Sequence, residues 1–384
     1  MPRWQTLTGI AIGLAIGSFI AGLAGARHPK PPPAGPILSE CSGHFRELVI
    51  HYEPSAREVV ESTYSQFLTA LESDVTVYVV CPTHAAFDEL LNFVGPVRCR
   101  LKPIAVNHDM TVWSRDRWIA LGPENGITTL LHSPAEASAE IWPARAGDER
   151  ISGDIARALS AAVVARCAAF YFDGGDFLVD DETVFVAPRV LHRNIQRTTP
   201  DKEHFITDLE RTLNRRVVLL DQAPNHHAAM FMVSVGNNTM LVGDPSLGRA
   251  FLPTSASVPF PELAGGPDFS KETQHLFDAV ARQCADTGYR VVRIPTIPAA
   301  DGRSYLTYVN CLIDRQGSRR FVYLPFYQNA DALNAAARAI WEELGFEVRP
   351  VDCTSTYRQF GALHCLVNVL SRSTNDLAKR SAGN

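Results

Sequence analysis

The chain has 384 residues, of which 46% are hydrophobic and 20% are charged, and its formal net charge is −5. This is the composition of a folded globular protein, long enough to bury a large core in one or two domains. The mild acidic balance gives no electrostatic reason to expect nucleic acid as a partner.

The N-terminus is an uncharged, apolar stretch. Residues 7–26 carry no charged side chain, and about 20 apolar residues suffice to cross a bilayer. We therefore expect residues 1–26 to form a signal anchor or, because Ala24-Gly25-Ala26 has the small residues of a cleavage site, a signal peptide. A buried helix is the remaining alternative. The segment predicts a membrane-anchored protein with its domain in the periplasm or outside, or a secreted one.

A ridge of small residues follows the same stretch. It consists of Gly9, Gly13 and Gly17, and it could pack two such segments together in a homodimer. Glycines are also common in membrane spans without such contacts, so the oligomeric state stays open.

Two polar segments bound the part of the chain that should fold. Residues 27–40 include three consecutive prolines, which favour a stiff, extended linker. Residues 372–384 are polar, which is typical of a disordered tail. One folded domain is therefore predicted over residues 41–371.

Within this domain, short apolar runs alternate with helical patterns. Strands are predicted at residues 48–51, 75–80, 97–106, 168–172, 183–187, 217–220, 230–235, 240–242, 290–294 and 321–324. Helices are predicted at residues 56–71, 83–94, 151–162, 202–213, 272–287 and 330–344. Loops are predicted at residues 124–126, 244–248 and 259–268. The alternation indicates an α/β fold, with a strand–helix–strand unit that recurs without a strict period.

The cysteines argue against a structural metal site. They stand at positions 41, 81, 99, 167, 284, 311, 353 and 365. No C-x-x-C pair occurs, so structural zinc is not expected. Export would allow disulfides among the first seven. Cys365 follows Gly361-Ala362, and a glycine-containing turn could keep its thiol accessible as a nucleophile. The alternative is a small buried cysteine in the core.

Two acidic segments could bind a flat cation. Asp173-Gly174-Gly175-Asp176 places two carboxylates around a glycine pair that lets a ligand approach the backbone. The alternative is a plain turn between strands. Arg115-Asp116 lies between two tryptophans, and here the alternative is a structural ion pair.

One histidine segment could supply a proton donor and acceptor. His226 and His227 precede a predicted strand, where a histidine can act as general acid and base near neutral pH. The alternative is a surface or core histidine. No helix-borne zinc motif and no glycine-rich nucleotide-binding loop is present, so we expect neither a metal nor a cofactor.

The four segments, in this order, resemble the motifs of the guanidino-group modifying superfamily, the penteins. Arg115-Asp116 and Asp173-Gly174-Gly175-Asp176 look like its two acidic motifs. His227 and Leu363-His364-Cys365 look like its histidine motif and its closing cysteine motif. The chain looks most similar to agmatine deiminases and bacterial peptidylarginine deiminases over roughly residues 45–370. One departure is Ala229, which stands where most members have a second guanidinium-binding aspartate.

The resemblance implies a pentein fold, an α/β propeller of five ββαβ-like modules. It implies that Cys365 and His227 are catalytic and that Asp116, Asp173, Asp176 and Arg115 bind substrate. The expected reaction is hydrolysis of the guanidino group of a small molecule or of peptidyl-arginine, through a covalent cysteine adduct, to a ureido product and ammonia. An amidinotransferase is one alternative. A membrane-tethered, non-catalytic guanidinium-binding module is another, and Ala229 is the feature that favours it.

Overall fold

The computed structural model describes residues 34–136, 143–255 and 257–373. The predicted membrane segment at residues 1–26 lies outside these ranges. Among the residues described, no helix has the length and apolar character needed to cross a membrane. The folded unit begins at Gly35.

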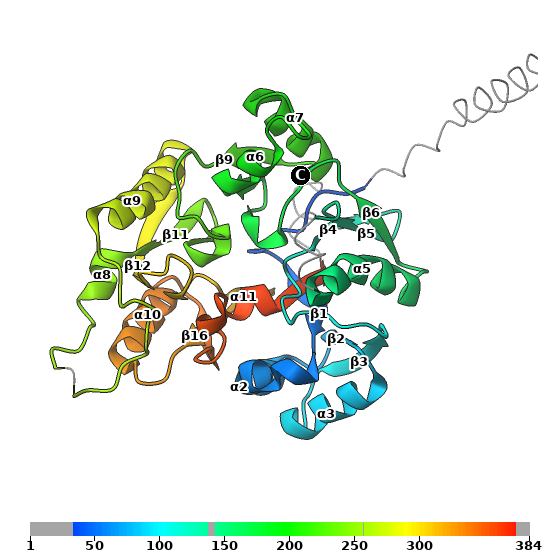
Figure 1. The fold of residues 1–384 in the computed structure, drawn as a ribbon, viewed down its shortest axis with the longest axis horizontal. Helices are drawn as coiled ribbons and strands as arrows, with labels where there is room; N and C mark the ends of the chain where they lie inside the picture. Colours follow the sequence, from blue (N-terminus) through cyan, green and yellow to red (C-terminus); the bar gives the residue numbers. More distant parts are fainter. Residues whose placement is uncertain (1–33, 137–142, 256, 374–384) are drawn as a thin grey trace, which may run out of the picture. The chain divides into compact units, whose positions relative to one another are not determined.

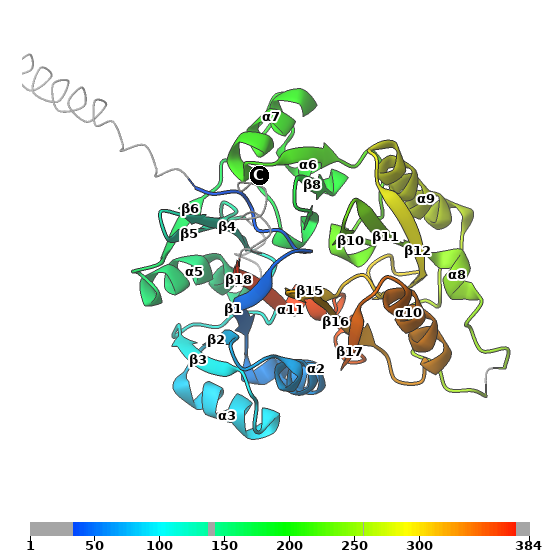
Figure 2. The ribbon, with the colours of Figure 1, turned by 180° about the vertical axis from the view of Figure 1, so that it is seen from behind.

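Five sheets of one design make up this unit (Figure 1). In each sheet, two antiparallel neighbours are followed by a strand that runs parallel to the second of them. The parallel step needs a crossover connection, and a helix supplies it each time. Each sheet with its helices is therefore a ββαβ module, and the modules surround a common centre in Figures 1 and 2.

The first module contains both ends of the folded unit. Its strands are β18 (Val367–Ser373), β1 (His44–His51), β2 (Thr76–Cys81) and β3 (Arg100–Ala105). Its helices are α2 (Arg57–Ala70) and α3 (His84–Val94), preceded by the turn η1 (Pro54–Ala56). The last strand thus pairs with the first, with His44 opposite Ser373.

The second and third modules carry the acidic segments. The second consists of β4 (Trp118–Glu124), β5 (Ile127–His132), α5 (Pro143–Ala158) and β6 (Val163–Cys167). The third consists of η2 (Gly174–Asp176), β7 (Phe177–Val179), β8 (Thr183–Val186), α6 (Pro188–Asn194), α7 (Lys202–Leu213) and β9 (Arg216–Leu219).

The fourth and fifth modules carry the histidine and cysteine segments. The fourth consists of η3 (Ala228–Met230), β10 (Met232–Gly236), β11 (Thr239–Asp244), α8 (Pro245–Arg249), α9 (Lys271–Asp286) and β12 (Arg290–Pro295). A two-stranded ladder of β13 (Ile297–Pro298) and β14 (Tyr305–Leu306) follows. The fifth consists of β15 (Leu312–Gln316), β16 (Arg319–Phe326), α10 (Asp331–Glu343) and β17 (Glu347–Asp352), before η4 (Tyr357–Gln359) and α11 (Leu363–Leu366).

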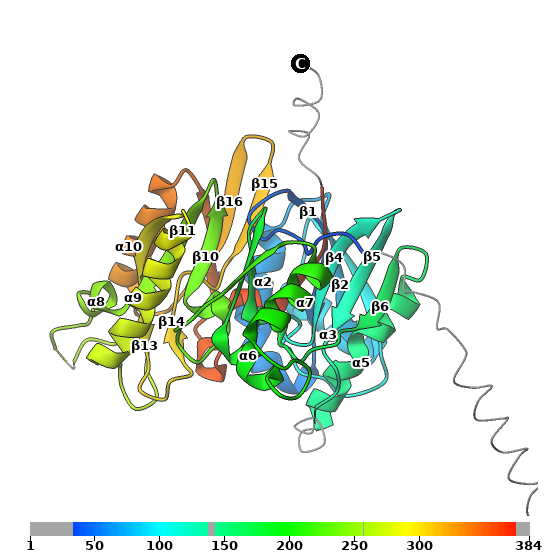
Figure 3. The same ribbon diagram turned by 90° about the horizontal axis from the view of Figure 1, so that it is seen from above.

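Neighbouring modules contact each other directly. Figure 3 shows β15 and β16 beside β10, where Arg315 donates a hydrogen bond to the Val235 carbonyl at 2.7 Å. The helices lie on the outside in Figure 1, whereas α11 lies close to the centre. The segment with Cys365 is therefore held in the middle of the unit.

Most predicted elements lie where the sequence placed them, and α7 has the predicted bounds. The prediction was wrong in the second module, where α5 ends at Ala158 and the strand predicted at 168–172 lies instead at Val163–Cys167. The reason is tertiary, because β6 must lie along β5, with Thr128 opposite Val163. Most of the loop predicted at 244–248 is the short helix α8, which continues to Arg249 and is capped by the Asp244 side chain.

Both boundaries of the predicted domain also need correction. The linker predicted over 27–40 ends early, because Ile37 forms a β-bridge with Leu121. The tail was predicted to include residues 372 and 373, but these lie in β18, which continues to Ser373 in pairing with β1. Composition alone was a poor guide to these two boundaries, because backbone hydrogen bonds to a neighbouring strand can order polar residues as well.

Candidate functional site

The four predicted segments meet in the middle of the unit. The Gly174 N–H donates to the Asp116 carbonyl at 2.7 Å, which joins the two acidic segments. His227 Nε2 lies 3.7 Å from Asp173 Oδ2, which adds the histidine segment. The Arg115 N–H donates to the Cys365 carbonyl at 3.2 Å, so the cysteine segment lies against the first acidic one.

The glycine pair makes this convergence sterically feasible. A Cβ on Gly174 would lie 2.2 Å from the Arg115 carbonyl oxygen, and a Cβ on Gly175 would lie 2.7 Å from His227 Nδ1. Real side chains do not tolerate such contacts. The two glycines are thus required for close approach of the neighbouring segments.

Cys365 is buried, with 3% of its surface exposed. The Asn310 side-chain N–H₂ donates to the thiol sulfur at 3.3 Å, and the Asn310 side-chain oxygen accepts from the backbone N–H of His364 at 3.0 Å. Asn310 thus holds both the sulfur and the backbone beside it. Sequence reasoning missed this residue, for which the only signal was a polar side chain inside an apolar run.

His227 is positioned between an acid and the thiol. Burial acts to lower the pKa of His227, but hydrogen bonding to Asp173 and to Cys365 outweighs it and raises that pKa to about 10. The ring is therefore protonated at neutral pH. A protonated imidazole ring thus lies beside the Cys365 thiol.

Asp173 is the most heavily paired acid of the site. Its Oδ2 accepts from Arg189 at 2.8 Å and from Arg193 at 3.1 Å. Its Oδ1 accepts from Arg145 at 3.2 Å and lies 3.4 Å from Arg117. Burial opposes ionisation, but His227 and these arginines hold the pKa of Asp173 well below its usual range.

The other carboxylates have different surroundings. Asp176 is fully buried and accepts the Asp173 backbone N–H at 3.1 Å, so it caps the turn η2, and burial raises its pKa. Asp116 accepts from Arg145 at 2.7 Å. The three acids predicted to bind substrate thus differ. Asp116 and Asp173 both bind Arg145, whereas Asp176 caps the turn and binds Arg189.

An open pocket of about 520 Å³ adjoins these acids. Its lining consists of Arg117, Glu136, Arg145, Asp173, Arg189, His192, Arg193 and Asn225. Sequence reasoning missed the arginines at 145, 189 and 193, which stand outside every recognisable motif and reach the site from α5 and α6.

Arg115 is not part of this set. Its guanidinium donates to Asn368 at 3.1 Å and to the carboxylate of Glu40, and Glu40 also contacts His364 Nε2 at 2.9 Å. Arg115, Glu40 and His364 line a separate cavity of about 20 Å³. Arg115 and Glu40 therefore brace the backbone on either side of the site rather than face the acids.

Ala229 is buried in the turn η3, with 1% of its surface exposed. Its carbonyl accepts from Asn310 at 3.3 Å. The position where the resemblance would place a second aspartate thus carries a methyl group, and its backbone helps to hold the asparagine that contacts Cys365.

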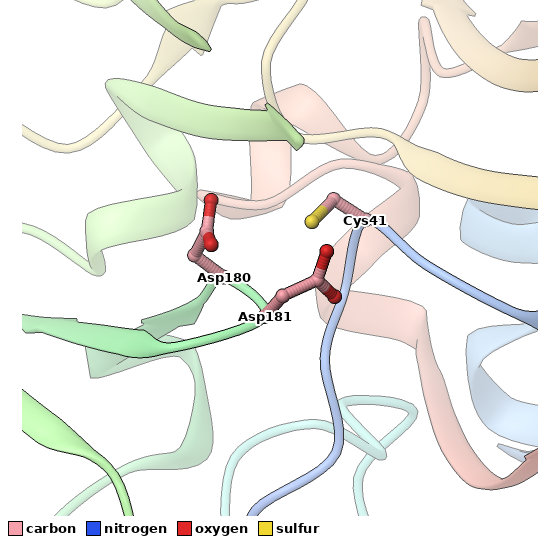
Figure 4. Close-up of side chains that lie close together, drawn as sticks. All are labelled: Cys41, Asp180 and Asp181. Atoms are coloured by element: carbon pink, nitrogen blue, oxygen red, sulfur yellow. The ribbon is translucent and has the colours of Figure 1, made fainter. Parts of the chain in front are cut away.

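One cluster elsewhere has the residue types of a metal site. Figure 4 shows Cys41, Asp180 and Asp181, whose ligand atoms lie within 4.8 Å of one another. Burial raises the pKa of the Cys41 thiol to about 11, and Ser234 donates to Asp180. None of the three residues lines the pocket beside Asp173, so the cluster is separate from the candidate site. All eight cysteines are free thiols.

Comparison with known proteins relates this chain to others through its structure. No protein-family model and no curated protein matches its sequence. An agmatine deiminase of C. jejuni superposes with a TM-score of 0.63 and 16% identity, over 88% of this chain and 97% of that one. A putative arginine deiminase from Porphyromonas gingivalis gives 0.65 and 18%, over 88% and 98%.

A third solved structure agrees with these two. It is an agmatine deiminase of Enterococcus faecalis, with a TM-score of 0.64 and 14% identity, over 88% of this chain and 96% of that one. Identities this low establish a shared fold and no more. The chain has the pentein-type α/β fold of these proteins, which confirms the predicted fold class for the folded unit.

Proposed function

We propose that this protein is a guanidino-group hydrolase that uses Cys365 as its nucleophile. The observation that carries the proposal is the convergence of Cys365, His227 and Asp173 from three separate modules. The three solved structures named above are deiminases by their descriptions and share the fold. Because fold alone does not imply activity, the argument depends on the side chains.

The proposed chemistry uses the groups at the positions described. The Cys365 thiolate attacks the central carbon of a guanidinium held by Asp116 and Asp173, and a covalent thiouronium adduct forms as ammonia leaves. His227 gives the proton that the departing amine needs. It then removes one from the water that attacks the adduct, so that the thiolate leaves and a ureido product remains. Asn310 stabilises the thiolate through its N–H₂ group.

Protonation of His227 sets the expected pH dependence. Its pKa of about 10 means that the acid form is present at neutral pH and is lost as the pH rises through that value. The activity of the free enzyme should therefore fall on the alkaline side, near pH 10, in a profile of kcat/KM against pH.

The test is a ureido-product assay on the full chain with agmatine, arginine, methylated arginines and an arginine-containing peptide. The wild type should convert at least one of them, and C365S should lose conversion completely. The matched control is C167S, because Cys167 is the exposed cysteine and lies outside the site. Equal activity of C365S and the wild type would overturn the proposal. The substrate converted best would also distinguish a small-molecule enzyme from one that acts on peptides.

A second candidate is a non-catalytic guanidinium-binding module, which Ala229 favours. This candidate predicts no product from any member of the panel together with a rise in melting temperature when a guanidino compound is added. The same samples therefore decide between the two functions.

A further inference from the structure

We infer that Arg145 occupies the place of the substrate guanidinium, so that the protein is held in a self-inhibited state until this side chain is displaced. The inference rests on the proposed function in one respect, because it takes Asp116 and Asp173 to be the groups that bind substrate. It adds a regulatory contact that the sequence motifs do not include.

The geometry is that of a bound guanidinium. Arg145 Nη1 donates to Asp116 Oδ2 at 2.7 Å, and Nη2 of the same group donates to Asp173 Oδ1 at 3.2 Å. One planar fork thus bridges two carboxylates from different modules. A substrate guanidinium has the same planar arrangement of N–H donors, so it would use the same oxygen atoms.

The cations already present at the two acids oppose the entry of another guanidinium. Within the residues that the structure describes, Arg145 is the one cation in ion-pair contact with Asp116. Asp173 already has Arg189 and Arg193 on its other oxygen, and Arg117 lies 3.4 Å from Oδ1. A guanidinium that entered while Arg145 stayed would find Asp116 Oδ2 and Asp173 Oδ1 already engaged and would place like charges side by side, which is unfavourable in a buried site.

Arg145 has space in which to be released. Its side chain is 17% exposed and it lines the open pocket of about 520 Å³ beside the acids. It stands near the start of α5, while the opposing acids are held by the turn η2 and by the backbone bond between Gly174 and Asp116. A rotamer change of one side chain would therefore release Asp116 from its ion pair and leave Asp173 Oδ1 in contact with Arg117 alone, without moving either acid.

The consequence is a competition between an internal and an external guanidinium. The internal guanidinium makes two charge-assisted hydrogen bonds, and we take the net advantage of removing it to equal about one such bond. Removing the competitor should therefore strengthen ligand binding by roughly 10- to 100-fold.

The experiment measures binding of agmatine and of Nα-acetylarginine amide by calorimetry, in the full chain carrying C365S so that no turnover intervenes. R145Q should bind at least one of the two probes roughly 10- to 100-fold more tightly than the parent. R150Q is the matched control, because Arg150 is an exposed arginine on the same helix, and it should leave the affinity unchanged.

R145K covers the case in which R145Q does not fold. Lysine keeps the charge but lacks the two-pronged fork, so it should still tighten binding, by a smaller factor. An affinity equal to or weaker than that of the parent, in an Arg145 variant with an unchanged melting temperature, would show that Arg145 is a structural ion-pair partner and would overturn the inference.

The two proposals fail in different ways. Tighter binding in R145Q, with no ureido product from any Cys365-containing protein, would uphold the inhibitory contact and refute hydrolysis. Product formation by the wild type, with a KM that R145Q leaves unchanged, would uphold hydrolysis and refute the contact. If both hold, R145Q with Cys365 intact should have a lower KM than the wild type.

Discussion

At the scale of single residues, the candidate site depends on two glycines, which have no side chain, as much as on its functional side chains. Gly174 and Gly175 allow two backbone segments and the His227 ring to approach within contact distance. His227 in turn has its pKa raised by the groups that this close approach brings together. A small steric change in the turn should therefore affect chemistry before it affects the fold.

The G175A variant tests this. Its new methyl group would overlap the His227 ring, with 2.7 Å to Nδ1, so the ring must shift. A misplacement of about 1 Å can cost roughly 100-fold in rate, and we expect kcat to fall by about 10- to 100-fold, as measured by the ureido assay.

The control for this prediction is G153A. Gly153 lies within α5, and a Cβ added there would have no neighbouring atom within 4 Å. Alanine at this position should therefore stabilise the protein by about 0.5–1 kcal/mol through helix propensity. Unchanged activity in G175A would mean that the ring position does not matter for the reaction.

At the scale of elements, the segment before β1 is a structural part of the site. Glu40 accepts hydrogen bonds from Arg115 and from the Val179 N–H, and it contacts His364. Burial opposes ionisation, but Arg115 and His364 lower the pKa of Glu40 to about 2. One buried carboxylate thus ties the second, third and fifth modules to the N-terminal segment.

The E40Q variant should lower the free energy of unfolding by about 3–5 kcal/mol, because it leaves the buried Arg115 without its counter-charge. Chemical denaturation at pH 7 measures this, with E343Q on the exposed face of α10 as the control. A loss below about 1 kcal/mol would contradict the proposed bracing role.

Glu40 also predicts an acid-sensitive contribution to stability. Its pKa in the folded state, about 2, lies below the ordinary value of 4.5. The stabilisation is therefore fully present above about pH 4.5 and is lost as the pH falls towards 2. Over that range, the wild type should lose more stability than E40Q.

At the scale of the folded unit, the final strand closes the arrangement of modules. β18 pairs with β1 along its length, and its side chains Val367, Val369 and Leu370 are buried. Burial of each such side chain contributes about 1.5–3 kcal/mol. Together these contributions approach the whole stability of a typical protein.

A chain that ends at Leu366 should therefore fail to fold cooperatively, although it keeps every residue of the candidate site. The reference is a chain that ends at Ser373. Thermal unfolding followed by circular dichroism compares the two. A cooperative transition of similar midpoint in both would show that β18 is dispensable for closure.

The sequence by itself determined the α/β class and most strands and helices, because apolar periodicity reflects which face of an element is buried. It also singled out Cys365, His227, Asp116 and Asp173 as candidates, since these residue types stand in short motifs. Each motif is local, so it can be read without knowledge of the fold.

Only the tertiary structure decided which groups face one another. Asn310 contacts the Cys365 thiol, and Arg145 bridges Asp116 and Asp173, although neither residue is near its partners in the sequence. Arg115 belongs to a motif, but its side chain binds Glu40. The same holds for β6, whose position follows from its pairing with β5. Such contacts depend on how whole modules pack, and the physical forces that set that packing leave no short-range pattern in the chain.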